Sequence, residues 1–266
     1  MSNYAQDLFS LEGTVALVTG ATRGIGLAAV RALASAGAHT FLTGLESEHP
    51  VDVADELRAE GLRVTGRILD VTDAHAQASL IAEIAHDHGR LDTLVCNAGM
   101  AIDPLGEPGQ PQRGDTAGLA ALDSMFDVHV RSVVSLCDDA CPVMASGGGG
   151  SVVIMSSLAG VRGNAAIGLY GITKAANAQL ARNLAVQWGP MNIRANAIAP
   201  GVIDTAFATP ITGNAALAER RLEKTSLRRF GSVDNIAGTI LYLASPAGAF
   251  TSGETLVVDG GTLVKD

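Results

Sequence analysis

Residues 14–26 read TVALVTGATRGIG, an apolar run that enters a turn with three glycines and continues into an Ala-rich apolar stretch. The unbroken run predicts a strand covered on both faces, and the stretch at 25–36 predicts a helix. A strand followed directly by a helix is the first half of a βαβ unit, in which helices connect parallel strands. These residues therefore predict an α/β fold built on a parallel sheet.

The same alternation continues along the whole chain. Seven strands are predicted, at 14–19, 38–43, 63–69, 91–96, 150–156, 192–198 and 254–258. The clearest helices besides 25–36 are predicted at 73–88, 168–188 and 233–244. With 266 residues, 47% of them hydrophobic, and no internal repeat, the chain is expected to form one domain that spans 1–266.

Two stretches interrupt this alternation. The stretch 101–118 is rich in Pro, Gly and Gln, and the stretch 202–228 follows Pro200-Gly201. Both predict loops or short mobile helices. Because loops on a rigid sheet often carry the contacts to substrate, we expect 202–228 to form a substrate lid within the domain.

The charge and the apolar runs exclude some classes of partner. A formal charge of −9 without clustered Lys and Arg argues against nucleic acid. No apolar run reaches the length of a membrane span, and the first residues do not resemble a signal peptide. We therefore expect no membrane partner and a cytoplasmic location.

The cysteines, Cys96, Cys137 and Cys141, form no CxxC pair and predict buried free thiols and no metal site.

The glycine turn is the first candidate binding site. Glycines allow a tight turn and a close approach of the backbone to a pyrophosphate, and the helix that follows offers free N–H groups. A dinucleotide site is the favoured interpretation, and a purely structural turn is the alternative. Asp70-Val71, Asn97-Ala98-Gly99 and Pro200-Gly201 also follow predicted strands. Each is ordinary turn chemistry on its own, but ligands bind open α/β sheets at this shared edge.

Tyr170 and Lys174 are the first candidate catalytic pair. They lie four residues apart in the predicted helix 168–188, so their side chains share one face. A neighbouring ammonium is expected to lower the pKa of the phenol toward the working pH, as acid–base catalysis requires. Ser157, after the fifth predicted strand, can hydrogen-bond the same substrate oxygen. The alternative is a surface Tyr and a surface Lys at a chance spacing.

These residues together resemble the short-chain dehydrogenases/reductases, and the resemblance covers residues 9–262. It rests on the TGATRGIG turn, Asn97-Ala98-Gly99, Ser157 thirteen residues before Tyr170, the Tyr170-Gly-Ile-Thr-Lys174 motif, Pro200-Gly201 with Thr205, and the closing SGETLVVDGG. The resemblance implies a Rossmann-like, doubly wound domain with a seven-stranded parallel sheet. It also implies a homotetramer or homodimer that moves a hydride between a nicotinamide and the carbonyl or secondary alcohol of a small molecule.

The resemblance also implies a division of roles among the residues. Tyr170 would donate or accept the proton, Lys174 would hold the nicotinamide ribose, and Ser157 would orient the substrate oxygen. Ile203 and Thr205 would contact the nicotinamide amide. The implied cofactor contacts are Gly20, Thr22, Arg23, Gly24, Ile25, Gly26, Asp70, Val71, Asn97, Ala98, Gly99, Tyr170, Lys174, Pro200, Gly201, Ile203 and Thr205.

His129 departs from the family pattern. Family members usually carry Asn at this place, in a segment that resembles Asp127-Val128-His129, and that Asn helps hold a water that connects the Lys to solvent. We expect the main-chain contact to be kept and the ring to carry protons near neutral pH, so that the relay survives. His129 is therefore counted with the catalytic residues. The alternative is a His that only fills space.

Cofactor and substrate choice depend on few residues. Gly44 ends the second predicted strand, where a carboxylate would select NAD, and Arg23 suits the 2′-phosphate of NADP. Glu46 favours NAD, and we expect NADP(H) to be preferred over NAD(H).

The pocket walls are expected to include Leu158, Arg162, Asn164 and Ile167 with the stretches 101–118 and 202–228. Arg162 suits a carboxylate, with a solvated arginine as the alternative, and substrate identity stays open.

Three other functions are weighed. Enoyl reductases of this fold usually place Tyr and Lys seven residues apart, and the spacing of four disfavours them. A catalytically silent, nucleotide-sensing protein is disfavoured by the intact Ser, Tyr and Lys and is kept open by His129. An extended-family epimerase or dehydratase would have a larger C-terminal part.

Overall fold

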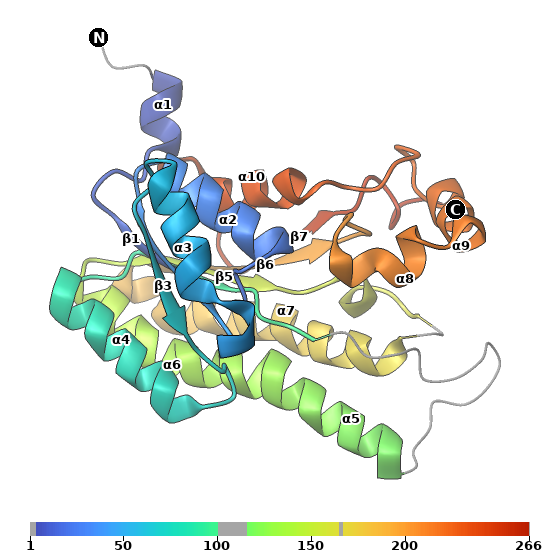
Figure 1. Ribbon diagram of the computed structural model, residues 1–266, viewed down its shortest axis with the longest axis horizontal. Helices are drawn as coiled ribbons and strands as arrows, with labels where there is room; N and C mark the ends of the chain where they lie inside the picture. The colour runs from blue at the N-terminus through green and yellow to red at the C-terminus, as the bar shows by residue number, and fades with distance from the viewer. Residues whose placement is uncertain (1–3, 101–115, 165–166, 266) are drawn as a thin grey trace.

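The computed structural model describes residues 4–100, 116–164 and 167–265 (Figure 1). The described strands form one sheet of seven in the order β3-β2-β1-β4-β5-β6-β7, and every neighbouring pair is parallel. This confirms the predicted fold class. The strands are β1 Val15–Val18, β2 His39–Gly44, β3 Val64–Ile68, β4 Thr93–Cys96, β5 Gly150–Met155, β6 Ile193–Pro200 and β7 Thr255–Val258.

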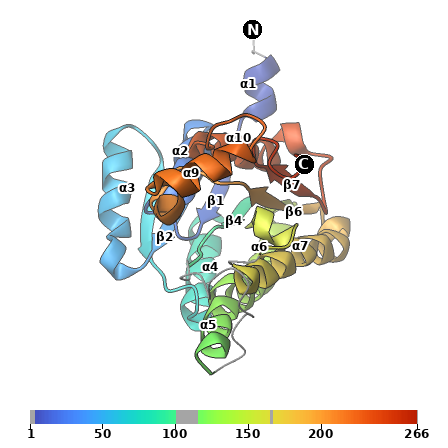
Figure 2. The same cartoon turned by 90° about the vertical axis from the view of Figure 1, so that its right-hand side faces the viewer.

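Helices cover both faces of the sheet (Figure 2). One face carries α2 (Gly24–Ser35), α3 (Pro50–Ala59) and α10 (Val233–Ala244). The other carries α4 (Ala74–His88), α6 (Ser132–Ser146) and α7 (Gly168–Trp188). The four helices singled out from the sequence agree with the structure to within one residue at either end.

Two hydrophobic cores lie on the two faces, and the strands supply both. Along β1, Val15 and Leu17 point into one core, and Ala16 and Val18 point into the other. All four are buried, which explains why the sequence shows an unbroken apolar run and not an alternation. The three cysteines lie in the first core as free thiols, as predicted.

The remaining elements lie at the ends of the sheet. The stretch 202–228, expected to act as a lid and called the lid below, contains short helices and connecting turns, as predicted, and 101–115 lies outside the described residues. No described helix combines the length and apolar character that crossing a membrane requires. The elements are α1 Tyr4–Phe9, η1 Glu46–Glu48, α5 Thr116–Phe126, η2 Asp127–Arg131, η3 Leu158–Gly160, η4 Gly189–Met191, η5 Ala206–Ala208, α8 Thr209–Thr212, α9 Ala215–Glu223 and η6 Pro246–Gly248.

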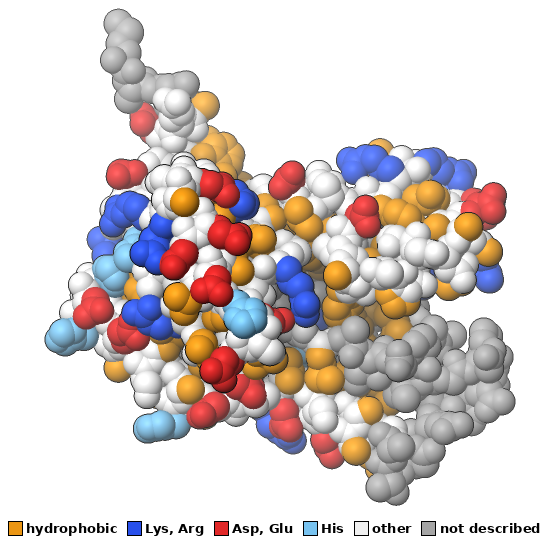
Figure 3. Space-filling view, viewed as in Figure 1, with side chains coloured by type: hydrophobic (Ala, Val, Ile, Leu, Met, Phe, Trp, Pro, Cys, Tyr) orange, Lys and Arg blue, Asp and Glu red, His pale blue; other side chains and the backbone are white. Residues whose placement is uncertain are grey.

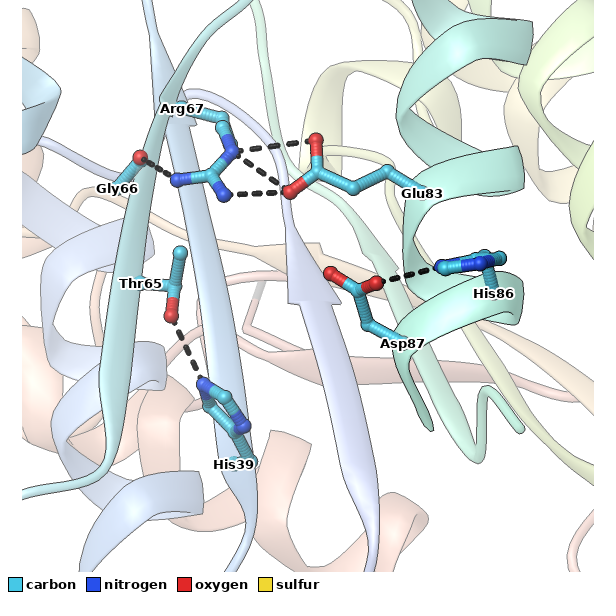
Figure 4. A network of polar contacts seen from close by, with 7 residues as sticks. All are labelled: His39, Thr65, Gly66, Arg67, Glu83, His86 and Asp87. Atoms are coloured by element: carbon cyan, nitrogen blue, oxygen red, sulfur yellow. Dashed lines mark hydrogen bonds and ion pairs between the residues drawn. The ribbon is translucent and has the colours of Figure 1, made fainter. Parts of the chain in front are cut away.

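Polar contacts fasten the edge strand β3 to its neighbours (Figure 4). The ring of His39 on β2 lies 2.9 Å from the hydroxyl of Thr65 on β3. Arg67, two residues further along β3, donates to the carboxylate of Glu83 on α4 at 2.9 Å. These contacts hold the edge of the sheet that lies furthest from the catalytic candidates.

The visible surface carries mixed charges. On the face shown in Figure 3, Lys and Arg side chains are interspersed with Asp and Glu, and its described part shows no continuous basic area.

Candidate active site

The glycine turn connects β1 to α2 at the carboxyl edge of the sheet. Gly20 and Gly24 have φ angles of +59° and +57°, which side chains rarely adopt. A Cβ at Gly26 would lie 2.4 Å from the Gly20 carbonyl oxygen and 2.6 Å from the Asn97 amide nitrogen. Only glycine fits there, so strand and helix can approach as closely as the sequence predicts.

Asn97 supports this turn from the next strand. Its side-chain amide donates to the carbonyl oxygens of Thr19 at 3.0 Å and of Gly20 at 2.8 Å. The Thr19 hydroxyl accepts from the backbone N–H groups of Asn97 and Ala98, at 3.1 Å each. Thr19 is thus a supporting residue that sequence reasoning did not select, although a hydroxyl directly before the first glycine of the turn was visible there.

The turn and the start of α2 fit the pyrophosphate of a dinucleotide. Arg23 is the N-cap of this 12-residue helix, and no side chain caps its first N–H groups. Free N–H groups and the positive end of the helix dipole favour a phosphate. A Cβ at Gly24 would lie 3.7 Å from the Thr205 methyl group, so the segment after β6 lies beside the turn.

The other predicted cofactor residues lie at the same edge. The strand order reverses between β1 and β4, which is the place where open α/β sheets bind ligands. Asp70 and Val71 follow β3, where the Asp70 carboxylate accepts the Thr72 N–H at 2.9 Å. Gly201 follows β6, and a Cβ there would lie 2.8 Å from the Asp259 Cα.

The end of β2 carries an acidic side chain that sequence reasoning missed. Glu48 forms an ion pair with Arg23 at 3.2 Å, and its carboxylate also accepts the Leu45 N–H at 3.1 Å. A Cβ at Gly44 would lie 2.6 Å from a Thr22 methyl carbon and 3.0 Å from the Glu48 carboxylate. A side chain at Gly44 would therefore crowd the side chains of Thr22 and Glu48, and Glu48 supplies the negative charge beside Gly44.

Ser157, Tyr170 and Lys174 are brought together as predicted. Ser157 directly precedes η3, where its hydroxyl accepts the Ala159 N–H at 3.1 Å, and it lies close enough to Tyr170 to lower the pKa of the phenol. Tyr170 lies in the first turn of α7. One turn further, the Lys174 Nζ lies 5.5 Å from the centre of the Tyr170 ring and donates to the Met155 carbonyl at 3.0 Å.

Burial decides the pKa values of this pair. Burial raises the pKa of Tyr170 to about 12, and the nearby Ser157 hydroxyl only partly opposes this rise. Burial also lowers the pKa of Lys174 to about 8. The expected net fall in the pKa of the phenol is not found, because desolvation dominates in this arrangement. Tyr170 is therefore a protonated acid at neutral pH.

His129 lies in the π turn η2, between α5 and α6, and is fully buried. Its Nε2 accepts the Met100 N–H at 3.0 Å. Its Nδ1 lies 2.9 Å from the Thr173 hydroxyl, which itself donates to the Tyr170 carbonyl at 2.9 Å. Because the Thr173 proton is already used, the imidazole proton belongs on Nδ1, and the ring is a neutral donor and acceptor.

This geometry corrects the role expected for the His129 ring. Burial, and then the nearby charge of Lys174, lower the pKa of His129 to about 3. A second ring proton would also break the bond from Met100. The ring therefore does not exchange protons near neutral pH, and instead fastens Met100 and the first turn of α7 in place.

The lid reaches the catalytic residues. Phe207 in η5 lies with its ring centre 6.4 Å from that of Tyr170, and Tyr170 also meets the His129 ring edge-to-face at 5.5 Å. Ile203, at the start of the lid, pairs with Gly231 in an isolated bridge. Phe207 was not predicted, although an aromatic residue within an irregular stretch is a usable signal.

Comparison with known proteins agrees with this geometry. Residues 20–262 match the family model described as "Enoyl-(Acyl carrier protein) reductase". Dehydrogenase/reductase SDR family member 4 from Oryctolagus cuniculus is 35% identical over 253 residues, covering 94% of this chain and 94% of that protein. Its counterpart from Sus scrofa is 37% identical over 254 residues, covering 95% and 88%.

Solved structures are similar over nearly the whole chain. A gluconate 5-dehydrogenase from Burkholderia cenocepacia, in complex with NADP and tartrate, has a TM-score of 0.90 and 29% identity, covering 99% of this chain and 100% of that one. A 7α-hydroxysteroid dehydrogenase, complexed with NADH and 7-oxo glycochenodeoxycholic acid, has a TM-score of 0.87 and 31% identity, covering 98% of each. This chain therefore belongs to the short-chain dehydrogenase/reductase family of NAD(P)-dependent oxidoreductases.

Proposed function

We propose that this oxidoreductase acts on the CH–OH group of a small alcohol, or on the matching ketone, with Tyr170 as proton donor or acceptor. The observation that carries the proposal is that Ser157 and the Lys174 ammonium both lie beside the Tyr170 phenol. The spacing of four between Tyr170 and Lys174 supports carbonyl chemistry over enoyl reduction. The named relatives are dehydrogenases or reductases, and they lend no support to a silent nucleotide sensor.

The three side chains divide the proton chemistry. In the direction of reduction, the Ser157 and Tyr170 hydroxyls donate hydrogen bonds to the substrate carbonyl oxygen, and the Tyr170 proton then moves to that oxygen. The Lys174 ammonium lies beside the phenol and stabilises the tyrosinate that remains. In the direction of oxidation, the same groups act in reverse.

The cofactor residues are proposed at the positions named above. A bound nicotinamide dinucleotide supplies or accepts the hydride. The glycine turn and the start of α2 would hold the pyrophosphate, Asp70 and Val71 would face the adenine, and Lys174 with Tyr170 would hold the nicotinamide ribose. His129 joins this set as a positioning residue, since both ring nitrogens are used in hydrogen bonds to the protein.

We infer a preference for NADP(H). Arg23 is largely exposed at the glycine turn, and Gly44 at the end of β2 carries no carboxylate. Arg23 already pairs with a carboxylate, that of Glu48, so an anionic 2′-phosphate can take the place of this partner. We assign to Glu48 the effect that was expected of Glu46, namely to favour NAD. The ion pair of Glu48 with Arg23 reduces that effect.

Further proposals concern the whole protein. The chain acts as one domain, 1–266, with the lid over the substrate, and it assembles as a homotetramer or homodimer. The half-exposed edge strand β7 supports assembly. The three buried free thiols support a cytoplasmic location, because reducing compartments keep thiols free.

One experiment tests the function directly. The purified protein is mixed with NADPH or NADH and a panel of ketones, keto acids, sugars and steroid carbonyls, and reduced-nicotinamide absorbance is followed. Tyr170→Phe, which keeps the ring and removes the hydroxyl, is the control. We expect turnover that the variant loses by roughly a thousandfold or more, since the general acid is gone. Tight cofactor binding without any turnover would contradict the proposal, and equal efficiency with both cofactors would contradict the NADP preference.

A further inference from the structure

Arg162 lies in a loop that packs closely against α7, the helix that carries the catalytic pair. It lies five residues after Ser157, in the loop that follows η3. A Cβ at Gly160 would lie 2.6 Å from the Lys174 carbonyl carbon, and one at Gly171 would lie 2.5 Å from the Ala159 carbonyl oxygen. This backbone contact leaves the η3 loop little freedom to move relative to α7.

Arg221 reaches the same neighbourhood from the lid. The Thr225 hydroxyl donates to the Arg221 carbonyl at 2.9 Å and lies 3.0 Å from the Thr262 hydroxyl. Arg162 donates to the Thr262 carbonyl at 3.4 Å. Thr225 and Thr262, both buried, thus connect α9 to the loop after η3. Burial first, and then the charges of Arg162 and Arg220, lower the pKa of Arg221, so the charge of Arg162 acts on Arg221.

Neither cation has a carboxylate partner among the described residues. Arg162 makes only the long bond to the Thr262 carbonyl, and no bond or ion pair of the Arg221 side chain is found in the described part of the chain. Arg31, Arg67 and Arg90 each pair with a Glu or Asp. Half-buried cations that lie near one another are unfavourable unless an anion joins them.

The lid that carries Arg221 also contacts one of the reacting groups. The same lid brings Phe207 to Tyr170, and it lies at the end of the molecule where α7 begins (Figure 1). In a chain of net charge −9, the lid carries four basic and three acidic residues. An anion that most of the surface repels is therefore attracted at this site.

We propose that Arg162 and Arg221 together bind a carboxylate of the substrate, so that the enzyme acts on keto acids and hydroxy acids in preference to neutral carbonyl compounds. This inference rests on the proposed function and names its substrate class. Two planar guanidinium groups from opposite walls suit a carboxylate, which accepts hydrogen bonds through both oxygens. Ligand binding would then close the lid onto the η3 loop by neutralising two like charges.

The kinetic test compares acids with their esters. Keto acids with increasing separation between ketone and carboxylate are assayed beside their methyl esters, with wild type, Arg162→Met and Arg221→Met. Arg220→Met is the matched control, because it removes the same charge from the same helix at an exposed position. We expect kcat/KM for the preferred acid to fall on the order of 10- to 100-fold in both test variants, as loss of a charged hydrogen-bond partner predicts.

The esters and a lysine variant separate binding from damage to the fold. We expect kcat/KM for the esters to change less than about threefold in every variant, since neutral substrates lack the ionic partner. Arg221→Lys is expected to restore part of the lost efficiency, because it keeps the charge without the planar fork. An acid-to-ester ratio that stays the same in Arg162→Met and Arg221→Met would overturn the inference, as would an equal loss in Arg220→Met. Preference for a phosphorylated ketone over every acid would overturn the carboxylate assignment.

A binding measurement keeps this inference separate from the proposed function. Succinate, which has no reducible ketone, is added to the protein with NADPH, and the melting temperature is compared with that in dimethyl succinate. We expect succinate to raise the melting temperature of wild type and Arg220→Met, but not of Arg221→Met. Protection by succinate without turnover of any compound would refute the proposed function and retain the carboxylate site. Turnover of neutral ketones without acid preference or protection would do the opposite.

Discussion

The catalytic residues show how strongly burial governs single side chains. Lys174 is buried, and its only described hydrogen bond from the ammonium is to the Met155 carbonyl. With a pKa of about 8, against an ordinary 10.5, it loses its proton just above neutral pH, while Tyr170 keeps its own proton until about 12. The group that titrates near the working pH is therefore the lysine.

The pH profile of reduction tests this assignment. We expect kcat/KM to be flat below pH 8 and to fall by about tenfold per pH unit above it, as the ammonium that supports tyrosinate is lost. The profile is measured by steady-state kinetics with saturating cofactor. Lys174→Met should lower the rate and abolish this falling limb. A limb that persists unchanged in the variant would assign the titration to another group.

His129 is expected to govern acid stability instead of proton transfer. Its folded pKa of about 3 lies below the unfolded value of 6.5, so the folded state favours the neutral ring. Its contribution is fully present above pH 6.5 and is lost as the pH falls toward 3. Between pH 7 and pH 5, we expect His129 to account for a loss on the order of 2 kcal/mol in the free energy of unfolding.

The variant His129→Asn isolates this effect. Urea unfolding at pH 7 and pH 5 should show a smaller acid loss in the variant than in wild type. At pH 7 the variant should be less stable by about 1–3 kcal/mol, because hydrogen bonds to Met100 and Thr173 are broken. Its rate at pH 7 should not rise. An increase of more than roughly tenfold would mark His129 as a defect of the site, since asparagine would then serve as the better relay.

At the scale of elements, the first strand, the glycine turn and α2 behave as one unit. Gly26→Ala would press a methyl group against the Gly20 carbonyl and the Asn97 amide. We expect nicotinamide dinucleotide binding to weaken by at least about tenfold, because the turn must shift away from the pyrophosphate. Binding is measured by titration calorimetry.

Gly238→Ala is the matched control for that substitution. Gly238 lies exposed in α10, and a Cβ there would meet nothing within 4 Å. It should leave dinucleotide binding unchanged and stabilise the helix by up to about 1 kcal/mol. Equal binding by both variants would show that the close packing of the turn is not needed.

The elements were predictable because their signals are local. TVALVT and the runs after it are apolar enough to define the strands, and Gly89 with φ +68° ends α4 where the sequence indicates. The pairing of Glu48 with Arg23 and the contact of Phe207 with Tyr170 depend on residues far apart in the chain. The reversed shift of the Tyr170 pKa escaped prediction for the same reason, since the spacing to Lys174 gives proximity but not desolvation.

At the scale of the whole molecule, the edge strand β7 is the feature on which we expect association to depend. β7 pairs only with β6 among the described strands, and its four residues are half-exposed or exposed, with Val257 at 38%. Phe250, just before this strand, is fully exposed. Apolar edges of this kind are normally covered in a stable protein.

Association through β7 can be measured by light scattering after size-exclusion chromatography. We expect wild type to form a dimer or tetramer and Val257→Lys to shift it toward smaller species at micromolar concentration. Val51→Lys on α3 is the control, because Val51 is similarly exposed, at 45%, on a helix away from this edge. A monomeric wild type, or equal dissociation in both variants, would exclude β7 as the interface.

The π turn has a consequence for the angular phase of the helix that contains it. Each residue of an α-helix advances about 100° around the axis. A π turn needs more residues to complete one turn, so it changes the angular position of every later residue around the axis relative to an unbroken α-helix. The turn at Asp127–Arg131 therefore decides which side of α6 faces the sheet. Removing a single residue there would rotate Leu136, Cys137 and Cys141 out of the core. This short segment can accept substitutions far more readily than any change in its length.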